Sequence, residues 1–470
     1  MVTREGHNSL TVTPVSGRKP ARKHRSLEFG CGAWHNIPGM KWLVFMLAGA
    51  LCGAAAAEPV GHNAAFFYWK AVGLLRPART PGQLELLRFV DEELPLLPPR
   101  ILEARPSVLN WLLGEQGMGD ALRDAAGCAG CDFGARRLAG PFLDLTHLAR
   151  LPALGRRACA LAQALEFTGR PADAARLLAA LLELVRRLDA DRSAASGLAA
   201  ADLMQTALWS LEGLVSRHPS AETIAPLVEY FRAAGEPPFH AAACLRDEAE
   251  RMTAWLRQDA AVAAGEIRRR AGTGPLAAAA ERAAAASPSE FEGWVVEYGA
   301  RMEEIVCALE QPFAKGAPVL VRLDAGRAEG LKDPAAEPNP LLILLVPAVS
   351  DFQQRLDLAR AQWDMAALLC AASARRARTG NWPDRASAAA RDIGRRTPRD
   401  PFSGEPIHYR LARGQPVLGA RVPKAMAEAG GVLYSLDPAE RGRRDEERFR
   451  QAIQRARELE FRELFEPAAP

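Results

Sequence analysis

Two strong helical patterns meet across a turn in residues 146–188, and this feature most constrains what the chain can fold into. Apolar residues recur on both sides of the turn at the three-and-four spacing of one helix face. Between them, Gly169 suits the left-handed position that ends a helix, and Pro171 suits the first turn of the next. Each helix has an apolar stripe to bury, so the sequence predicts an antiparallel hairpin covered by further helices.

The composition favours helices along the whole chain. Apolar residues make up 49% of the 470 residues, and most of them are Ala and Leu. These two are strong helix formers, whereas strands are enriched in β-branched and aromatic residues. We therefore predict a mainly α protein, in which irregular antiparallel helical hairpins precede a small α+β C-terminal region with a long helix and a short antiparallel sheet.

The basic residues that give the chain its net charge of +4 lie in the first 57 residues, and the remainder is close to neutral. A basic surface for nucleic acid is therefore not expected.

Residues 40–57 have the order of a secretory signal peptide, with a positive start, a short apolar run and an Ala-x-Ala end. This pattern predicts export to the periplasm or the cell surface after cleavage near Ala57. The alternative is an uncleaved single-pass anchor at 42–57, but the apolar run is shorter than the ~20 residues that a spanning helix needs. Both Met1 and Met40 are candidate start codons.

Composition changes along the chain suggest its domain boundaries. We predict a leader at 1–57 whose signal-peptide core is 40–57, a helical-hairpin domain at 58–311, a Pro- and Gly-rich linker at 312–340, and an α+β region at 341–470 that ends in a C-terminal helix. Within the linker, Val319 to Leu323 predicts one strand.

Cys128 and Cys131 form a Cys-Ala-Gly-Cys pair. In an oxidising compartment this spacing predicts a local disulfide or two packed thiols. A redox site would place the pair at the start of a helix after a strand, and no such unit is visible. A zinc site would need a second ligand pair, and only His147 lies nearby. We therefore predict a structural pair, with no catalytic residue, no cofactor and no metal.

The second helix of the opening hairpin resembles the second half of a tetratricopeptide repeat. Gly169, Ala174, Leu178 and Leu181 carry the likeness. The other predicted hairpins do not keep this motif, so we expect tetratricopeptide-like hairpins without a regular array.

The C-terminal part from Leu341 to Ser435 has an order of motifs that is similar to the soluble half of a type II secretion pseudopilin. A long helix is followed by a Gly-x-x-Pro turn, an Asp-Pro-aromatic-Gly-x-Pro loop, a Tyr-bearing strand and a Tyr-Ser strand. The matching residues are Gly380, Pro383, Asp400, Pro401, Phe402, Gly404, Pro406, Tyr409, Tyr434 and Ser435.

Two departures limit what this resemblance implies. The apolar N-terminus that a peptidase processes in pseudopilins is absent from this chain. The acidic, Gly-rich calcium loop after Tyr-Ser is replaced by Leu436, Asp437, Pro438 and Ala439. No calcium site is therefore expected here.

Three shorter motifs make the chain similar to a family of uncharacterised exported bacterial proteins. That family combines an Asn-Ala-Ala opening helix, a Cys-Asp-aromatic-Gly loop, a helical middle and a pseudopilin-like end. The matching residues are Asn63, Ala64, Ala65, Cys131, Asp132, Phe133, Gly134, Asn339, Pro340 and Leu341. The resemblance covers most of the chain and implies no chemistry.

These observations favour a non-enzymatic exported scaffold or protein-binding module. The alternatives are an accessory of a secretion or pilus-like machine, and an enzyme without a recognisable motif, since no nucleophile elbow or His-Glu-x-x-His helix is present. A protein partner is expected and nucleic acid is not. Membrane contact is expected only through an uncleaved leader, and the oligomeric state is left open.

Overall fold

The computed structural model describes residues 63–76, 81–133, 146–273, 276–412, 414–421, 435–436, 447 and 450. The chain divides into two units between Ala57 and Glu58, and all of these residues belong to the second. The predicted signal peptide at 40–57 lies outside the described residues. Within them, no helix combines the length and the apolar character needed to cross a bilayer.

The predicted hairpin is confirmed as helices α6 (Thr146–Phe167) and α7 (Pro171–Asp189). Gly169 has φ +77° and Pro171 opens α7, as the sequence predicts. The Gly169 N–H donates to the Glu166 carbonyl at 3.0 Å, and the Arg170 N–H donates to the Leu165 carbonyl at 2.8 Å. These two bonds form a Schellman motif, which satisfies carbonyls at the end of α6.

The described part of the protein is mainly helical, as predicted. The elements before the hairpin are α2 (Ala64–Leu74), α3 (Pro81–Arg88), a π-helical turn (Phe89–Glu93), 3-10 turns at Leu94–Leu96 and Pro99–Leu102, α4 (Pro106–Leu113) and α5 (Gln116–Ala126). Those after it are α8 (Ala194–Arg217), α9 (Ala221–Ala234), α10 (Ala241–Gln258), α11 (Ala260–Ala271), α12 (Ala277–Ala285), α13 (Pro288–Glu310), α14 (Phe313–Gly330), α15 (Pro340–Leu345), α16 (Val349–Thr379) and α17 (Ala386–Asp392).

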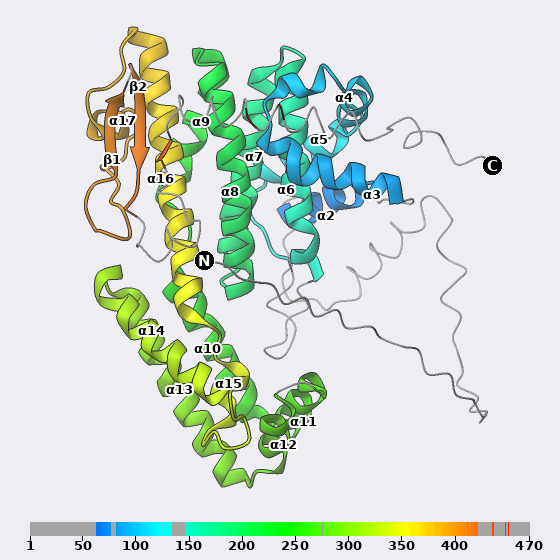
Figure 1. Ribbon diagram of the computed structural model, residues 1–470, viewed down its shortest axis with the longest axis vertical. Coiled ribbons are helices and arrows are strands. Elements are labelled where there is room, and N and C mark those ends of the chain that lie inside the picture. Colours follow the sequence, from blue (N-terminus) through cyan, green and yellow to red (C-terminus); the bar gives the residue numbers. More distant parts are fainter. Residues whose placement is uncertain are drawn as a thin grey trace, which may run out of the picture. The chain divides into compact units, whose positions relative to one another are not determined.

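Residues 312–340 contain helix α14 (Figure 1), so the predicted strand at Val319 to Leu323 is wrong. Leu320 and Leu323 are buried on α14 while Val321 is exposed, which is the three-residue spacing of one helix face. Pro318 lies inside this helix, which packs against α13 and α16. Tertiary packing has thus overridden the local strand preference.

One hydrophobic core continues across this region. It includes buried residues from Ala64 on α2 to Ala420 after the sheet. Helix α16 packs against α8 and α9 (Figure 1) and carries Trp363, which is fully buried beside Phe231 of α9. The boundary at 312–340 stays a prediction, but the helices on its two sides share their core.

A small antiparallel sheet follows α17, as the sequence predicts. Its strands are β1 (His408–Ala412), β2 (Gln415–Gly419) and the two-residue β3 (Ser435–Leu436), in the order β1-β2-β3. Gly414 has φ +74° in the turn between β1 and β2. The Tyr409 hydroxyl donates to the Pro383 carbonyl at 2.8 Å, which ties β1 to the turn after α16.

A buried ion cluster joins α6 to the segments before it. Arg157 donates to Glu115 Oε1 at 2.9 Å and to Asp91 Oδ1 at 2.7 Å. Its guanidinium also lies over the Trp111 ring, 4.5 Å from the centroid. The side chains of Arg157 and Glu115 are only 3% and 2% exposed. Each charge in this cluster therefore depends on its partners rather than on water.

Candidate functional site

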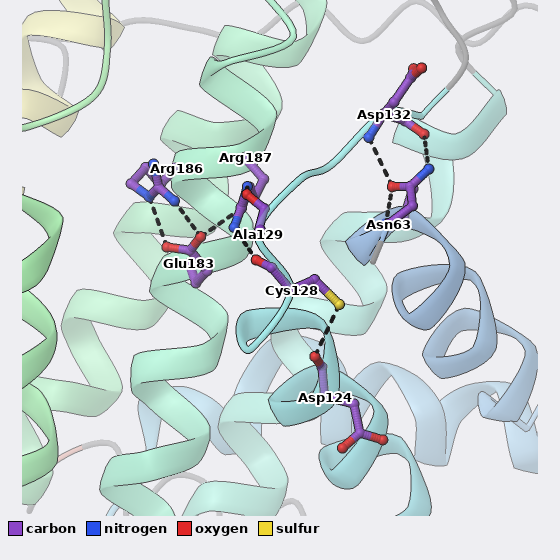
Figure 2. A network of polar contacts seen from close by, with 9 residues as sticks. Asn63, Asp124, Cys128, Ala129, Asp132, Glu183, Arg186 and Arg187 are labelled. Atoms are coloured by element: carbon purple, nitrogen blue, oxygen red, sulfur yellow. Dashed lines mark hydrogen bonds and ion pairs between the residues drawn. The ribbon is translucent and has the colours of Figure 1, made fainter. Parts of the chain in front are cut away.

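The predicted cysteine pair lies in a short loop, residues 127–133, that follows α5. Asn63 holds the end of this loop through its Nδ2, which donates to the Asp132 carbonyl at 3.0 Å, and through its Oδ1, which accepts from the Asp132 N–H at 2.9 Å. The same Oδ1 accepts from the Ala65 N–H at 3.0 Å and so caps α2. Figure 2 shows Asn63 facing Asp132 in this arrangement. The Asn-Ala-Ala and Cys-Asp-Phe motifs are thus brought together.

Aromatic stacking supports the same loop from inside. The rings of Tyr68 on α2 and Phe133 are stacked with their centroids 5.9 Å apart. Tyr68 is fully buried. The contact therefore ties the loop to the core as well as to the cap of α2, while Gly134 lies outside the described residues.

Both cysteines of the loop are thiols in this structure. Burial raises the pKa of Cys131 to about 12, and loss of solvation also raises the pKa of Cys128, although Arg187 opposes both shifts. Little thiolate forms at neutral pH under these conditions, and the thiolate is the nucleophile. The pair is therefore poorly suited to nucleophilic or redox catalysis, and the disulfide stays a prediction.

An ion network on α7 holds the loop from its other side (Figure 2). Arg187 donates to the carbonyl oxygens of Cys128 at 2.6 Å and Ala129 at 3.0 Å. Its Nε donates to Glu183 Oε1 at 2.6 Å, and Arg186 Nε donates to Glu183 Oε2 at 2.8 Å. The spacing of three and four residues places all three charged side chains on one face of the helix. Glu183 is thus neutralised by two arginines.

Beside this network, helices α5, α7 and α9 line an open groove with a volume of about 700 Å³, which we name the arginine groove. Its lining residues are Arg123 and Ala126 of α5, Arg176, Ala179, Ala180, Glu183, Arg186 and Arg187 of α7, and Pro226, Glu229, Tyr230, Ala233 and Ala234 of α9. Its lining combines small apolar side chains with charged ones. The groove therefore offers both an apolar surface and cationic groups.

Tyr230 places an unsatisfied hydroxyl in this site. Its Oη is buried and has no hydrogen-bond partner among the described residues. Burial raises the pKa of Tyr230 well above its usual value, and the neighbouring carboxylate of Glu183 acts in the same direction. The phenol is therefore protonated at neutral pH and remains able to donate a hydrogen bond.

The described residues contain no group of three or more His, Cys, Asp or Glu side chains that could hold a metal ion. The sequence-based expectation that no metal or cofactor binds stays a prediction.

Sequence reasoning did not find the arginine groove. Arg123, Arg176 and Tyr230 belong to three different helices, so their convergence is a property of the tertiary packing. The one available signal is Glu183 with Arg186 and Arg187 at helical spacing, and such triplets are more often solvated surface pairs.

Comparisons with models of protein families, with curated proteins and with solved structures found no match for this chain.

Proposed function

We propose that the protein is a non-enzymatic exported scaffold or protein-binding module, and that the arginine groove is its binding surface. The groove itself is the observation that carries this proposal. Its volume of about 700 Å³ falls in the range of ligand sites, and it is accessible between α5, α7 and α9. Helical hairpins stacked side by side commonly present such surfaces to partner proteins.

The chemistry near the groove favours binding over catalysis. Glu183 already accepts hydrogen bonds from Arg186 and Arg187, so its carboxylate oxygens are occupied by neighbouring side chains. Cys131 and Cys128 carry raised pKa values, so neither supplies a ready thiolate. These groups hold each other and the loop in place.

The proposed relationships to the two families come from the sequence motifs. Kinship with the uncharacterised exported family is supported by the joined Asn63 and Asp132 motifs. A pseudopilin-like C-terminal region is supported by the order of α16, its turn at Gly380 and the small sheet. A role as an accessory of a secretion machine is the second candidate, and it rests on that order.

A peptide-display selection on the mature protein tests the proposed function. We expect selected peptides to bind in the micromolar range, and to lose about tenfold or more in affinity when Ala233→Trp fills the groove from its exposed rim. Ala300→Trp places the same side chain on the exposed face of α13 and is the matched control. A selection that yields no peptide, or peptides that respond equally to both variants, would contradict the proposal.

A further inference from the structure

The charges of the arginine groove are unbalanced. Four arginines and two glutamates line it. Glu183 is already shared between Arg186 and Arg187, and Arg187 is further occupied by two carbonyl oxygens of the cysteine loop. Glu229 is exposed at the rim on α9. The groove therefore retains cationic groups that its own residues do not neutralise.

Three of these arginines keep hydrogen-bond donors for a ligand. A guanidinium has five N–H donors. Among the described contacts, Arg123 uses Nη2 for Asp120, Arg176 uses Nη1 for Asp173, and Arg186 uses Nε and Nη2 for Glu183. Their side chains are 34%, 54% and 38% exposed, so a ligand can reach them.

The existing pairs of Arg123 and Arg176 are easily exchanged for new ones. Asp120 is 63% exposed and Asp173 is 30% exposed. Exposed ion pairs at this spacing contribute only about 0–1 kcal/mol. A ligand that brings its own anionic groups can therefore displace them with little loss.

Tyr230 requires a hydrogen-bond acceptor from the ligand. Its hydroxyl is buried, protonated and without a partner among the described residues. A buried donor that lacks an acceptor is unfavourable, and an acceptor on a ligand would remove that penalty. The groove thus suits a ligand that carries oxygen acceptors along its length.

The small apolar residues of the lining indicate which kind of ligand carries those acceptors. Ala179, Ala180 and Ala234 leave room for a chain to lie close to the helices, and Pro226 adds an apolar surface. Carboxylates fit the planar fork of arginine, and an extended polypeptide can present them with a regular spacing. The chain beyond its leader is nearly neutral, which does not favour a nucleic acid.

We infer that the arginine groove binds an acidic peptide segment of a partner protein, whose carboxylates pair with Arg123, Arg176 and Arg186. This inference rests on the proposed function and specifies its partner. The Tyr230 hydroxyl donates a further hydrogen bond to the segment, and Glu229 disfavours a carboxylate on the α9 rim. Binding is therefore selective for peptides with acidic residues on the α5 and α7 sides.

Fluorescence anisotropy with synthetic peptides tests the selectivity. The probe is a labelled peptide of alternating Glu and Ala, and the comparison is the same peptide with Gln in place of Glu. We expect the Glu peptide to bind about tenfold or more tightly, with an affinity that falls as salt is raised. Equal affinity of the two peptides would overturn the acidic selectivity and leave the groove as a binding surface intact. If neither synthetic peptide binds and no display-selected peptide binds, the proposed function is overturned as well.

Substitutions assign the contacts to the groove. The double variant Arg123→Gln, Arg176→Gln is expected to weaken Glu-peptide binding about tenfold or more, and Tyr230→Phe about threefold. Arg269→Gln on α11 is the matched control, because Arg269 is 72% exposed and pairs with Glu266 at the same three-residue spacing. An equal loss in the control would overturn the assignment. Inorganic polyphosphate is the competing ligand. If it binds more tightly than the Glu peptide and depends on the same arginines, the ligand is a phosphate polymer, and the inference of an acidic peptide is overturned.

Discussion

Arg157 is the cation on which two carboxylates in the core depend, and its replacement by Met tests how the N-terminal segments are held to α6. Arg157→Met keeps an unbranched side chain of moderate size but removes both ion pairs. It leaves Glu115 with 2% and Asp91 with 15% side-chain exposure. Breaking a buried pair in this way typically lowers the free energy of unfolding by about 3–5 kcal/mol.

The ionisation of Glu115 sets the expected pH dependence. Burial raises its folded-state pKa above the usual value of 4.5, and Arg157 opposes this shift. Without Arg157 the folded-state pKa rises further, so the folded protein holds a proton that the unfolded chain releases. Each pH unit above 4.5 then lowers the stability by about 1.4 kcal/mol until the folded-state pKa is reached. The loss is therefore larger at pH 7 than at pH 5.

Urea denaturation followed by circular dichroism at pH 5 and pH 7 measures this difference. Adding Glu115→Gln to Arg157→Met should restore most of the stability at pH 7, because the amide needs no counter-charge. Arg269→Met, which removes an exposed pair on α11, should change stability by about 1 kcal/mol or less. A loss of the same size at both pH values, or no rescue by Glu115→Gln, would refute the reasoning.

Four further outcomes are expected. Leu178→Ala, at a side chain that is 1% exposed, should lower stability by about 2–5 kcal/mol and reduce hydrogen-exchange protection in α16 as well as in α7. Gly169→Val should cost about 1–2 kcal/mol through the backbone alone, since no atom lies within 4 Å of an added Cβ; a matching loss in Gly169→Asn would count against this. N-terminal sequencing of the mature protein should begin at or near Glu58. Thiol titration of protein purified from an oxidising compartment should find Cys128 and Cys131 unreactive until reduced.

Local signals in the sequence predict the local structure well. Gly169 and Pro171 locate the turn of the opening hairpin, and Asn63 locates the start of α2, because caps and turns depend on neighbouring residues. The segment at Val319 to Leu323 shows the limit of this reasoning. Its Val-Leu-Val residues favour a strand, but in the structure Leu320 and Leu323 are buried on one face of a helix that packs against α13 and α16.

The candidate site could be predicted only in part. The Cys128 and Cys131 loop is visible as a motif, yet its attachment to Asn63 and Arg187 joins residues that are about sixty to seventy positions apart. The arginine groove needs α5, α7 and α9 in their final places before Tyr230 and the arginines line the same cavity. The spacing of residues along one helix shows only which side chains share a face of that helix. A site formed by three helices therefore has no recognisable pattern in the sequence.

Because α16 packs against α8, which is made much earlier, this part of the core cannot form until late in synthesis. Arg355 on α16 bonds to Asp202 on α8, which is 153 residues earlier in the chain. At roughly 5–20 residues per second, a ribosome needs ~8–30 s to make the chain between them. During that interval the apolar face of α8 lacks its cover and is open to association with other nascent chains. A holding chaperone is therefore most useful during that interval, before α16 has been made.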